Sequence, residues 1–177
     1  MTLLPHYTGE FPAPEELIRQ MKETGVRAVT MFPATHGFSL SETVCGELFD
    51  VLEEHRIPLF LSMAECGGIS DVGELALSRP KLRIVVTNVD YRVDRELYPV
   101  LRRCRNLWVE TSGYKPFCGL TGICRDFGAD RFLFGSGMPF FSGISSAALV
   151  TYADMEEADR EKVAFRNLEK LLEEVTL

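Results

Sequence analysis

The chain has 177 residues, of which 46% are hydrophobic and 25% are charged, and its mean hydropathy is close to zero. These values suit an ordinary globular protein, and we expect residues 1–177 to form a single domain. The net charge of −7 argues against nucleic acids and anionic membrane surfaces as partners, because both favour clustered Lys and Arg.

The first residues of this sequence do not have the pattern of a secretory signal, and we expect none. They have no positive segment followed by an apolar one, and no uninterrupted apolar run approaches the roughly 18 residues of a membrane span. We therefore expect a cytoplasmic protein. The five cysteines form no CxxC pair, so we expect reduced, mostly buried thiols rather than disulfides or a zinc knuckle. They are Cys45, Cys66, Cys104, Cys118 and Cys124.

Short apolar runs then alternate with stretches of helical periodicity, a pattern typical of parallel strands joined by crossover helices. The predicted strands cover 27–33, 57–63, 82–88, 107–111 and 131–135, with a stub at 2–4. The predicted helices begin near Pro12 and Ser41 and then cover 71–77, 94–104, 119–127, 145–153 and 159–174. The sequence therefore predicts an α/β fold in which the five strands are parallel neighbours in chain order.

Several stretches resemble a known family. Phe127-Gly-Ala-Asp-Arg-Phe-Leu-Phe-Gly-Ser-Gly-Met-Pro139, followed by Phe165-Arg-Asn-Leu-Glu-Lys-Leu-Leu172, is similar to the last strand and closing helix of the amidohydrolase-related, metal-dependent hydrolases. Upstream, the segments 25–29, 57–62, 79–88 and 105–112 resemble strands of the same family in the same order. The resemblance runs from about residue 13 to the C-terminus.

This resemblance implies an incomplete or distorted (β/α) TIM-like barrel of about six parallel strands with outer helices. Its site is expected at the carboxyl ends of the strands. The family holds one or two divalent metals with an HxH pair on the first strand, a histidine on each of two middle strands and an aspartate on the last.

Those ligands are missing from the matching positions. Ser62 and Asn88 stand where the two middle histidines are expected, and Gly137 replaces the aspartate. The similarity begins after the strand that carries the HxH pair. Because a hydrolytic zinc needs about three His, Asp or Glu ligands, we predict that the chain binds no metal and no other cofactor.

Three histidines remain. His36 follows the strand at 27–33 and is the one expected on the catalytic face, either as a catalytic group or as a solvated loop residue. His55 lies in the last turn of a predicted helix, where a cation complements the helix dipole. His6 lies near the start of the chain and is assigned no role.

Three acids, Glu65, Asp90 and Glu110, follow or end predicted strands at the same edge. Carboxylates that meet in a pocket can act as acid and base, because proximity separates their pKa values. The alternative is that they are solvated or pair with Arg92 and Arg131.

The smaller polar residues at this edge are predicted to line a pocket rather than to act as nucleophiles, since no histidine is assigned beside them. They are Ser62, Asn88, Ser112 and Ser136, together with Gly137. The apolar cluster of 138–141 with Phe117 is expected to cap the core rather than to face a ligand.

Three functional hypotheses follow. The first is a degenerate amidohydrolase-related protein, a pseudoenzyme without metal-dependent hydrolase activity that keeps a small-molecule pocket. The second is an active hydrolase or decarboxylase of the same superfamily with a non-standard site, or a protein completed by an N-terminal segment that this sequence lacks. The third is a structural or interaction module that self-associates.

Self-association is expected because an incomplete barrel leaves unpaired strand edges. The seam must be closed by a partner chain, by residues 1–12 or by the C-terminal helices. A partner chain, making a homo-oligomer, is preferred, because two prolines and a glycine make residues 1–12 a poor strand.

Overall fold

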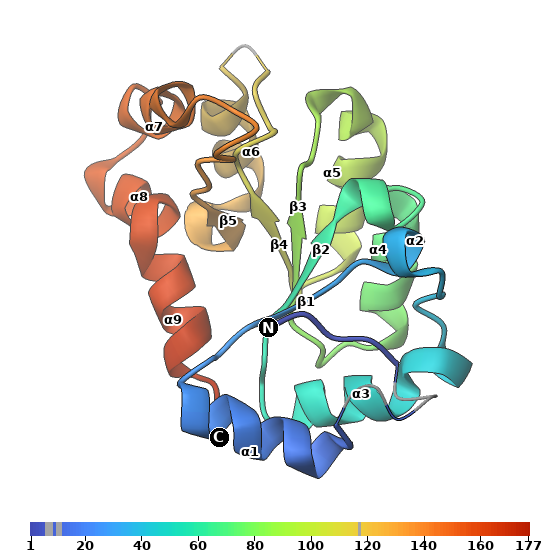
Figure 1. The fold of residues 1–177 in the computed structure, drawn as a ribbon. Helices are drawn as coiled ribbons and strands as arrows, with labels where there is room; N and C mark the ends of the chain where they lie inside the picture. Colours follow the sequence, from blue (N-terminus) through green and yellow to red (C-terminus); the bar gives the residue numbers. More distant parts are fainter. Residues whose placement is uncertain (6–8, 10–11, 117) are drawn as a thin grey trace.

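The computed structural model describes residues 1–5, 9, 12–116 and 118–177. Its centre is a five-stranded parallel sheet in the order β1-β2-β3-β4-β5, so each strand pairs with its neighbours in the sequence (Figure 1). The strands are β1 (Val29–Met31), β2 (Leu59–Ser62), β3 (Ile84–Thr87), β4 (Leu107–Glu110) and β5 (Phe132–Leu133). The predicted order and parallel direction are confirmed, although each strand is shorter than predicted.

Helices follow the strands as the sequence predicts. The longer ones are α1 (Pro14–Thr24), α3 (Glu42–Glu54), α4 (Ile69–Ser78), α5 (Asp94–Arg103), α6 (Gly119–Phe127) and α7 (Gly143–Thr151). The C-terminal helical segment consists of α8 (Glu157–Glu161), a π-helical turn (Lys162–Arg166) and α9 (Asn167–Glu173). Short 3-10 helices at Met63–Glu65, Tyr91–Val93 and Ala129–Arg131 complete the list. Among the described residues, no helix is long and apolar enough to cross a membrane.

Local signals explain where several helices begin and end. Pro14 lies in the first turn of α1, where its missing N–H removes no helical hydrogen bond, and Gly25 ends this helix in the left-handed conformation. In α5, acids occupy the first turn and arginines the last, which complements the helix dipole at both ends.

The strand predicted at 27–33 ends earlier than expected. A short helix, α2 (Pro33–His36), follows β1 directly, and Pro33 occupies its first turn. The prediction of a loop at this point was therefore wrong. Proline cannot donate to a sheet, but it suits the start of a helix, and that preference decides the local structure.

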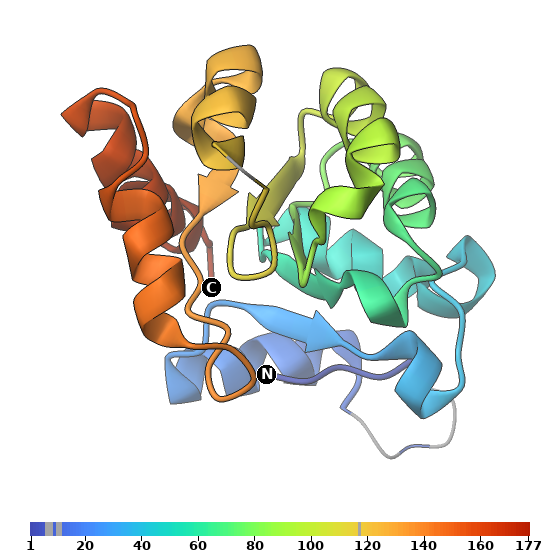
Figure 2. The same cartoon turned by 90° about the horizontal axis from the view of Figure 1, so that it is seen from above.

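The two faces of the sheet are buried by different elements. Alternate strand residues such as Leu61, Val86 and Val109 belong to the main core, which lies on the side of the outer helices. The intervening residues form a second cluster with α9. This cluster contains Phe60, Val85, Trp108 and Leu133 from the strands and Leu168 and Leu171 from α9. Helix α9 thus takes part in covering the inner face (Figures 1 and 2).

The outer edge of β1 is partly covered by the chain's own first residues. Thr2 forms a parallel bridge with Thr30, and Leu3 N donates to Thr30 O at 2.8 Å while Thr30 N donates to Met1 O at 2.8 Å. Leu3 is buried. The stub predicted at 2–4 therefore forms an isolated bridge beside β1 and not a full strand, so the sheet has five strands where about six were predicted. Covering this edge with the chain's own first residues is the solution that the sequence analysis had placed behind a partner chain.

The outer edge of β5 is met by the C-terminal segment. The amide of Phe134, just after β5, donates to the carbonyl of Val163 in the π-helical turn at 2.8 Å. Buried Asn167 donates through Nδ2 to the carbonyls of Ala129 and Phe132, each at 2.8 Å. The closing helix is therefore anchored to the backbone around β5.

The end of the chain also spans the amino ends of the strands. Thr176 N donates to His55 O at 3.0 Å, and the Nδ1 atom of His55 lies 2.5 Å from Thr176 O. Glu174 forms an ion pair with Arg83, directly before β3. His55 is thus a helix-end residue, as predicted, and it also holds the C-terminus.

Candidate functional site at the carboxyl ends of the strands

The predicted pocket residues do lie at the carboxyl edge of the sheet. Ser62 ends β2, Asn88 follows β3, and Glu110 ends β4. The Nδ2 group of Asn88 donates to Ser62 Oγ at 3.1 Å. Asn88 has a φ of 56°, a left-handed conformation that asparagine tolerates better than most residues. The structure therefore joins two of the predicted pocket residues directly.

Glu110 is held by the residue two positions further on. Its two carboxylate oxygens accept hydrogen bonds from Ser112 N at 2.8 Å and Ser112 Oγ at 2.7 Å. Ser112 is buried, whereas Glu110 is half-buried. The carboxylate also reaches the neighbouring strand end, because a Cβ atom on Gly135 would overlap its Oε1 atom. Glu110 thus depends on the glycine that follows β5.

Gly137 has little room for a side chain. Its φ of 65° lies in the left-handed region, where glycine is strongly favoured. A Cβ atom there would overlap the Phe141 ring and lie 3.0 Å from Ser112 Cβ. An aspartate at this position would therefore require both a strained backbone and movement of two neighbours. Nearby, Ser136 Oγ accepts from Met138 N at 3.3 Å.

His36 and Glu65 lie on short helices after β1 and β2. Glu65 accepts hydrogen bonds from Thr35 N at 2.8 Å and Thr35 Oγ1 at 2.7 Å. These hydrogen bonds lower the pKa of Glu65. His36 is exposed at the end of α2 and packs edge-on against Phe32, with ring centroids 5.9 Å apart. Both residues therefore have local structural partners.

Asp90 pairs with Arg92. The sequence analysis had named Arg92 and Arg131 as ion-pair partners for the acids, as the alternative to a catalytic role. Asp90 accepts from Arg92 N at 2.8 Å, Nε at 3.1 Å and Nη2 at 2.9 Å, and these hydrogen bonds lower the pKa of Asp90. The other arginine, Arg131, is buried and donates instead to the carbonyls of Leu101 and Cys104. The predicted pairing of Arg131 with a carboxylate is not seen in the described part of the chain.

The residues at the strand ends do not fit a divalent metal. Ser62 and Asn88 offer a hydroxyl and an amide that bond to each other, and Gly137 has no room for a carboxylate. Hydroxyl and amide groups are poor zinc ligands compared with His, Cys, Asp or Glu. Within the described ranges, no group of three or more His, Cys, Asp or Glu residues could hold a metal ion.

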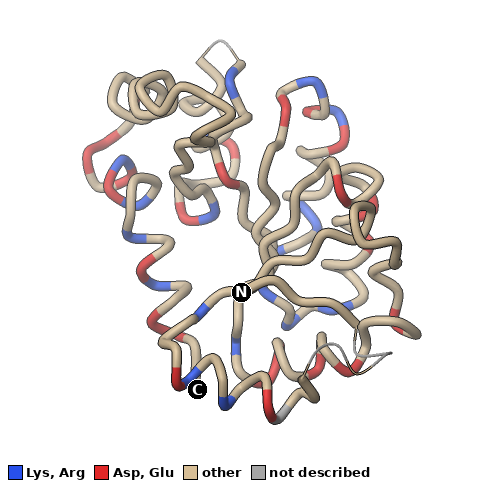
Figure 3. The backbone as a smooth tube through the Cα atoms, in the orientation of Figure 1, with Lys and Arg blue, Asp and Glu red and all other residues tan. Residues whose placement is uncertain are grey.

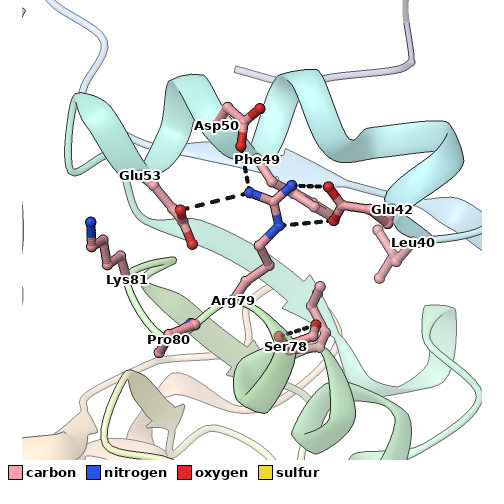
Figure 4. A pocket seen from close by; sticks show the side chains of 10 residues that line it. Leu40, Glu42, Phe49, Asp50, Glu53, Ser78, Arg79, Pro80 and Lys81 are labelled. Carbon is pink, nitrogen blue, oxygen red and sulfur yellow. Dashed lines mark hydrogen bonds and ion pairs between the residues drawn. The ribbon is translucent and has the colours of Figure 1, made fainter.

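A cavity of about 640 Å³ lies between α3 and α4, away from the strand ends (Figure 4). Arg79 forms ion pairs there with Glu42, Asp50 and Glu53, and its guanidinium lies 5.8 Å from the centre of the Phe49 ring. These hydrogen-bonded carboxylates raise the pKa of Arg79. Arg79 and these three acids are therefore paired with one another, and their ion pairs join α3 to the end of α4.

Two asparagines with structural importance were not singled out from the sequence. Asn106 Nδ2 lies within 3.1 Å of three carbonyls, those of Ala76, Arg79 and Leu82, and Asn167 anchors the closing helix. Both lie in the stretches that carry the family resemblance, Asn106 before β4 and Asn167 in the last helix. For Asn106, the signal that could have indicated it is an Asn directly before the apolar run of a strand.

The fold and these strand-end residues define a protein built on the amidohydrolase scaffold. A family model described as Amidohydrolase matches residues 6–173. The chain therefore belongs to this family. No curated protein matches the chain.

Solved structures agree on the fold. An uncharacterized TIM-barrel protein from Bordetella bronchiseptica superposes with a TM-score of 0.74 at 20% identity, covering 93% of this chain and 64% of that one. A 5-carboxyvanillate decarboxylase from Sphingomonas paucimobilis gives 0.72 at 14% identity, with 93% and 63% covered. A 4-oxalomesaconate hydratase from Rhodopseudomonas palustris gives 0.71 at 15% identity, with 97% and 64% covered. The chain thus spans slightly less than two thirds of these relatives, and the incomplete barrel predicted from the sequence is confirmed.

Proposed function

We propose that this protein is a member of the amidohydrolase family that has lost metal-dependent hydrolysis and binds a small molecule at the carboxyl ends of β2 to β5. The observation that carries the proposal is Gly137. Its backbone conformation and its contacts with Phe141 and Ser112 leave no room for the aspartate that the family resemblance places there. The residues around Gly137 thus occupy the space that a side chain at this position would need.

The groups at this edge suit hydrogen bonding to a polar ligand. Ser62 and Asn88 offer a hydroxyl and an amide, and Glu110 offers a carboxylate whose orientation is fixed by Ser112. Half-buried Phe60 and Trp108 belong to the inner face of the same strands. A few fixed polar groups near apolar side chains are typical of small-molecule sites.

Elemental analysis of the purified protein after dialysis tests this proposal. We expect well below one equivalent of zinc, manganese or iron per chain, with an authentic zinc hydrolase carried through the same dialysis as the positive control. A molar equivalent of metal that survives dialysis would overturn the proposal. His36, Glu65, Asp90 and Glu110 would then be the first ligands to substitute.

A second candidate is a hydrolase or decarboxylase of the same superfamily that works without the lost ligands. Glu110 favours it, because it places an ionisable group at the edge where barrel enzymes carry their chemistry. The similarity in fold to a 5-carboxyvanillate decarboxylase suggests 5-carboxyvanillate as the first substrate to test. Turnover by the wild-type protein that is lost in Glu110→Gln would support this candidate against the first.

We further propose a cytoplasmic protein in which residues 1–177 form one domain. Among the described residues the cysteines are free, and all but Cys118 are buried. Both ends of the chain contact the same sheet, as expected of one folding unit. The net charge of −7 still argues against a nucleic-acid partner.

A further inference from the structure

The segment from Phe132 to Ala153 contains no Asp, Glu, Lys or Arg, although a quarter of the chain is charged. Figure 3 draws α7 and the loop before it without charged residues, whereas the other long helices each carry charged residues. Five large apolar or aromatic side chains of this segment are exposed. They are Met138 (68%), Phe140 (90%), Phe141 (41%), Ile144 (83%) and Tyr152 (85%), which together we call the apolar surface.

The loop and the start of α7 form one structural unit. The sulfur of Met138 would lie 3.0 Å from a Cβ atom on Gly143, and Phe141 N donates to Gly137 O at 2.9 Å. Lys115 Nζ donates to Ser145 Oγ at 3.0 Å and lies 4.9 Å from the centre of the Phe141 ring. These contacts join Met138 and Phe141 to the start of α7, the helix that carries Ile144, and Tyr152 follows the other end of the same helix.

This arrangement corrects the expectation that 138–141 caps the core. The exposure of Met138 and Phe140 shows that these side chains point away from it. Phe117, the other member of the predicted cluster, lies outside the described residues. The core beneath is completed without them, since Phe132 and Val150 are buried at either end of the segment.

The exposed area is at the upper end of the range found on monomers. With about 150–250 Å² for a whole aromatic side chain, the five residues expose on the order of 600 Å². The largest apolar patch of a typical monomer is about 300–600 Å², whereas a standard interface buries about 800 Å² on each partner. The apolar surface with its immediate rim therefore approaches the area that a stable dimer needs.

We propose that the apolar surface is a self-association interface and that its occupant is the same surface of a second copy of this chain. Two copies with a charge of −7 each repel one another least where neither carries a charge. An uncharged patch can also meet itself across a two-fold axis without opposing like charges. Lys115 lies over the edge of this surface at Phe141 and belongs to its rim.

The outer edges of β1 and β5 are already partly covered by the chain itself, so they do not require a second copy. Residues 1–3 pair with the edge of β1, and the Val163 carbonyl accepts from the amide that follows β5. The homo-oligomer expected from the incomplete barrel is therefore assigned to a different surface. This inference does not depend on the proposed function.

Light scattering coupled to gel filtration tests the inference with the full chain at micromolar concentration. We expect a mass of about twice the 19.9 kDa of one chain for the wild type. The double variant Phe140→Glu/Ile144→Glu should elute as a monomer, because it places two charges on each copy within the interface. Tyr91→Glu is the matched control, since Tyr91 is a half-exposed aromatic residue in the 3-10 helix Tyr91–Val93, outside the apolar surface, and this variant should remain dimeric.

Circular dichroism of the double variant checks that its fold is retained, which is expected because both positions are exposed. Hydrogen exchange provides a second measurement that needs no variant, since residues 138–152 should become more protected as the wild-type concentration rises. A wild-type monomer at these concentrations would overturn the inference. A folded double variant that stays dimeric would do the same and would assign association to another surface.

Discussion

At the scale of single residues, Glu110 and Gly135 illustrate how two neighbouring strand ends are fitted to each other. The Glu110 carboxylate occupies the space that a side chain at position 135 would need. Ser112 fixes that carboxylate through two hydrogen bonds. The glycine is therefore required by its neighbour rather than by its own backbone, since its φ is not positive.

Gly135→Ala should destabilise the protein by about 1–3 kcal/mol, because the added methyl group overlaps a carboxylate that cannot easily move. In a Glu110→Ala background the same substitution should be neutral or stabilising by up to about 1 kcal/mol, since Gly to Ala then only reduces the entropy of the unfolded chain. Urea denaturation of the four proteins of this double-mutant cycle measures the coupling. Equal effects of Gly135→Ala in both backgrounds would contradict the close contact.

Asp94 is a second residue whose surroundings give a testable effect. Burial raises the pKa of Asp94, and its Oδ1 atom is buried without a hydrogen-bond partner among the described residues. The nearby hydroxyl of buried Tyr114 works in the opposite direction on the pKa of Asp94 but does not cancel the effect of burial.

Because the folded-state pKa of Asp94 lies above its ordinary value of 3.8, the folded protein binds more protons than the unfolded chain between these two values. This contribution to stability is greatest at low pH and is lost as the pH rises through that window. Asp94→Asn should therefore weaken the fall in stability above about pH 4. Denaturation at a series of pH values tests this, and identical pH profiles for the two proteins would contradict it.

At the scale of elements, the closing helix α9 has a role that the resemblance to the family did not reveal. Leu168 and Leu171 pack against the second cluster on the inner face of the sheet. The π-helical turn before α9 brings the Val163 carbonyl to the amide after β5. This helix therefore covers both an edge and part of a face of the incomplete barrel.

Leu171→Ala should destabilise the protein by about 2–5 kcal/mol, the range observed when a buried leucine is truncated. Leu171 is 3% exposed and belongs to a small cluster with few other members to fill the space. Leu172→Ala, at a less buried position of the same helix, is the control and should cost clearly less. Chemical denaturation compares them, and similar losses for both would show that the cluster contributes little.

At the scale of the whole molecule, the sequence predicted the order of the strands well, but it predicted poorly how the edges of the incomplete barrel are covered. The β-branched run of β3 and the regular alternation of strands and helices predicted the parallel order, because they reflect burial that every unit repeats. Contacts such as Asn167 with Ala129, or Leu3 with Thr30, join distant segments and leave no local pattern. The preference for a partner chain at the seam rested on the two prolines and the glycine in residues 1–12, whereas the contacts with β1 are made by residues 1–3, which contain neither.

The candidate site was predictable in position but not in contacts. Ser62 and Asn88 lie at the carboxyl ends of β2 and β3, because strand order fixes that edge, whereas Gly137 lies in the loop beyond β5. The resemblance could not show that Asn88 donates to Ser62, that Glu65 is held by Thr35, or that Asp90 turns to Arg92. Such pairings depend on side-chain rotamers, which strand periodicity does not specify.

The order of the strands also bears on how the chain can fold. Every paired strand is adjacent in the sequence to its neighbour, so the sheet can grow one unit at a time, from the N-terminus onward, as a ribosome releases the chain. Among the described residues, the side-chain hydrogen bond with the largest sequence separation runs from Arg27 to the carbonyl of Leu172 in the last helix, across 145 residues. Until that helix emerges, Phe60, Val85 and Trp108 lack two of their apolar neighbours. We therefore expect the sheet without α9 to expose apolar side chains and to be prone to aggregation.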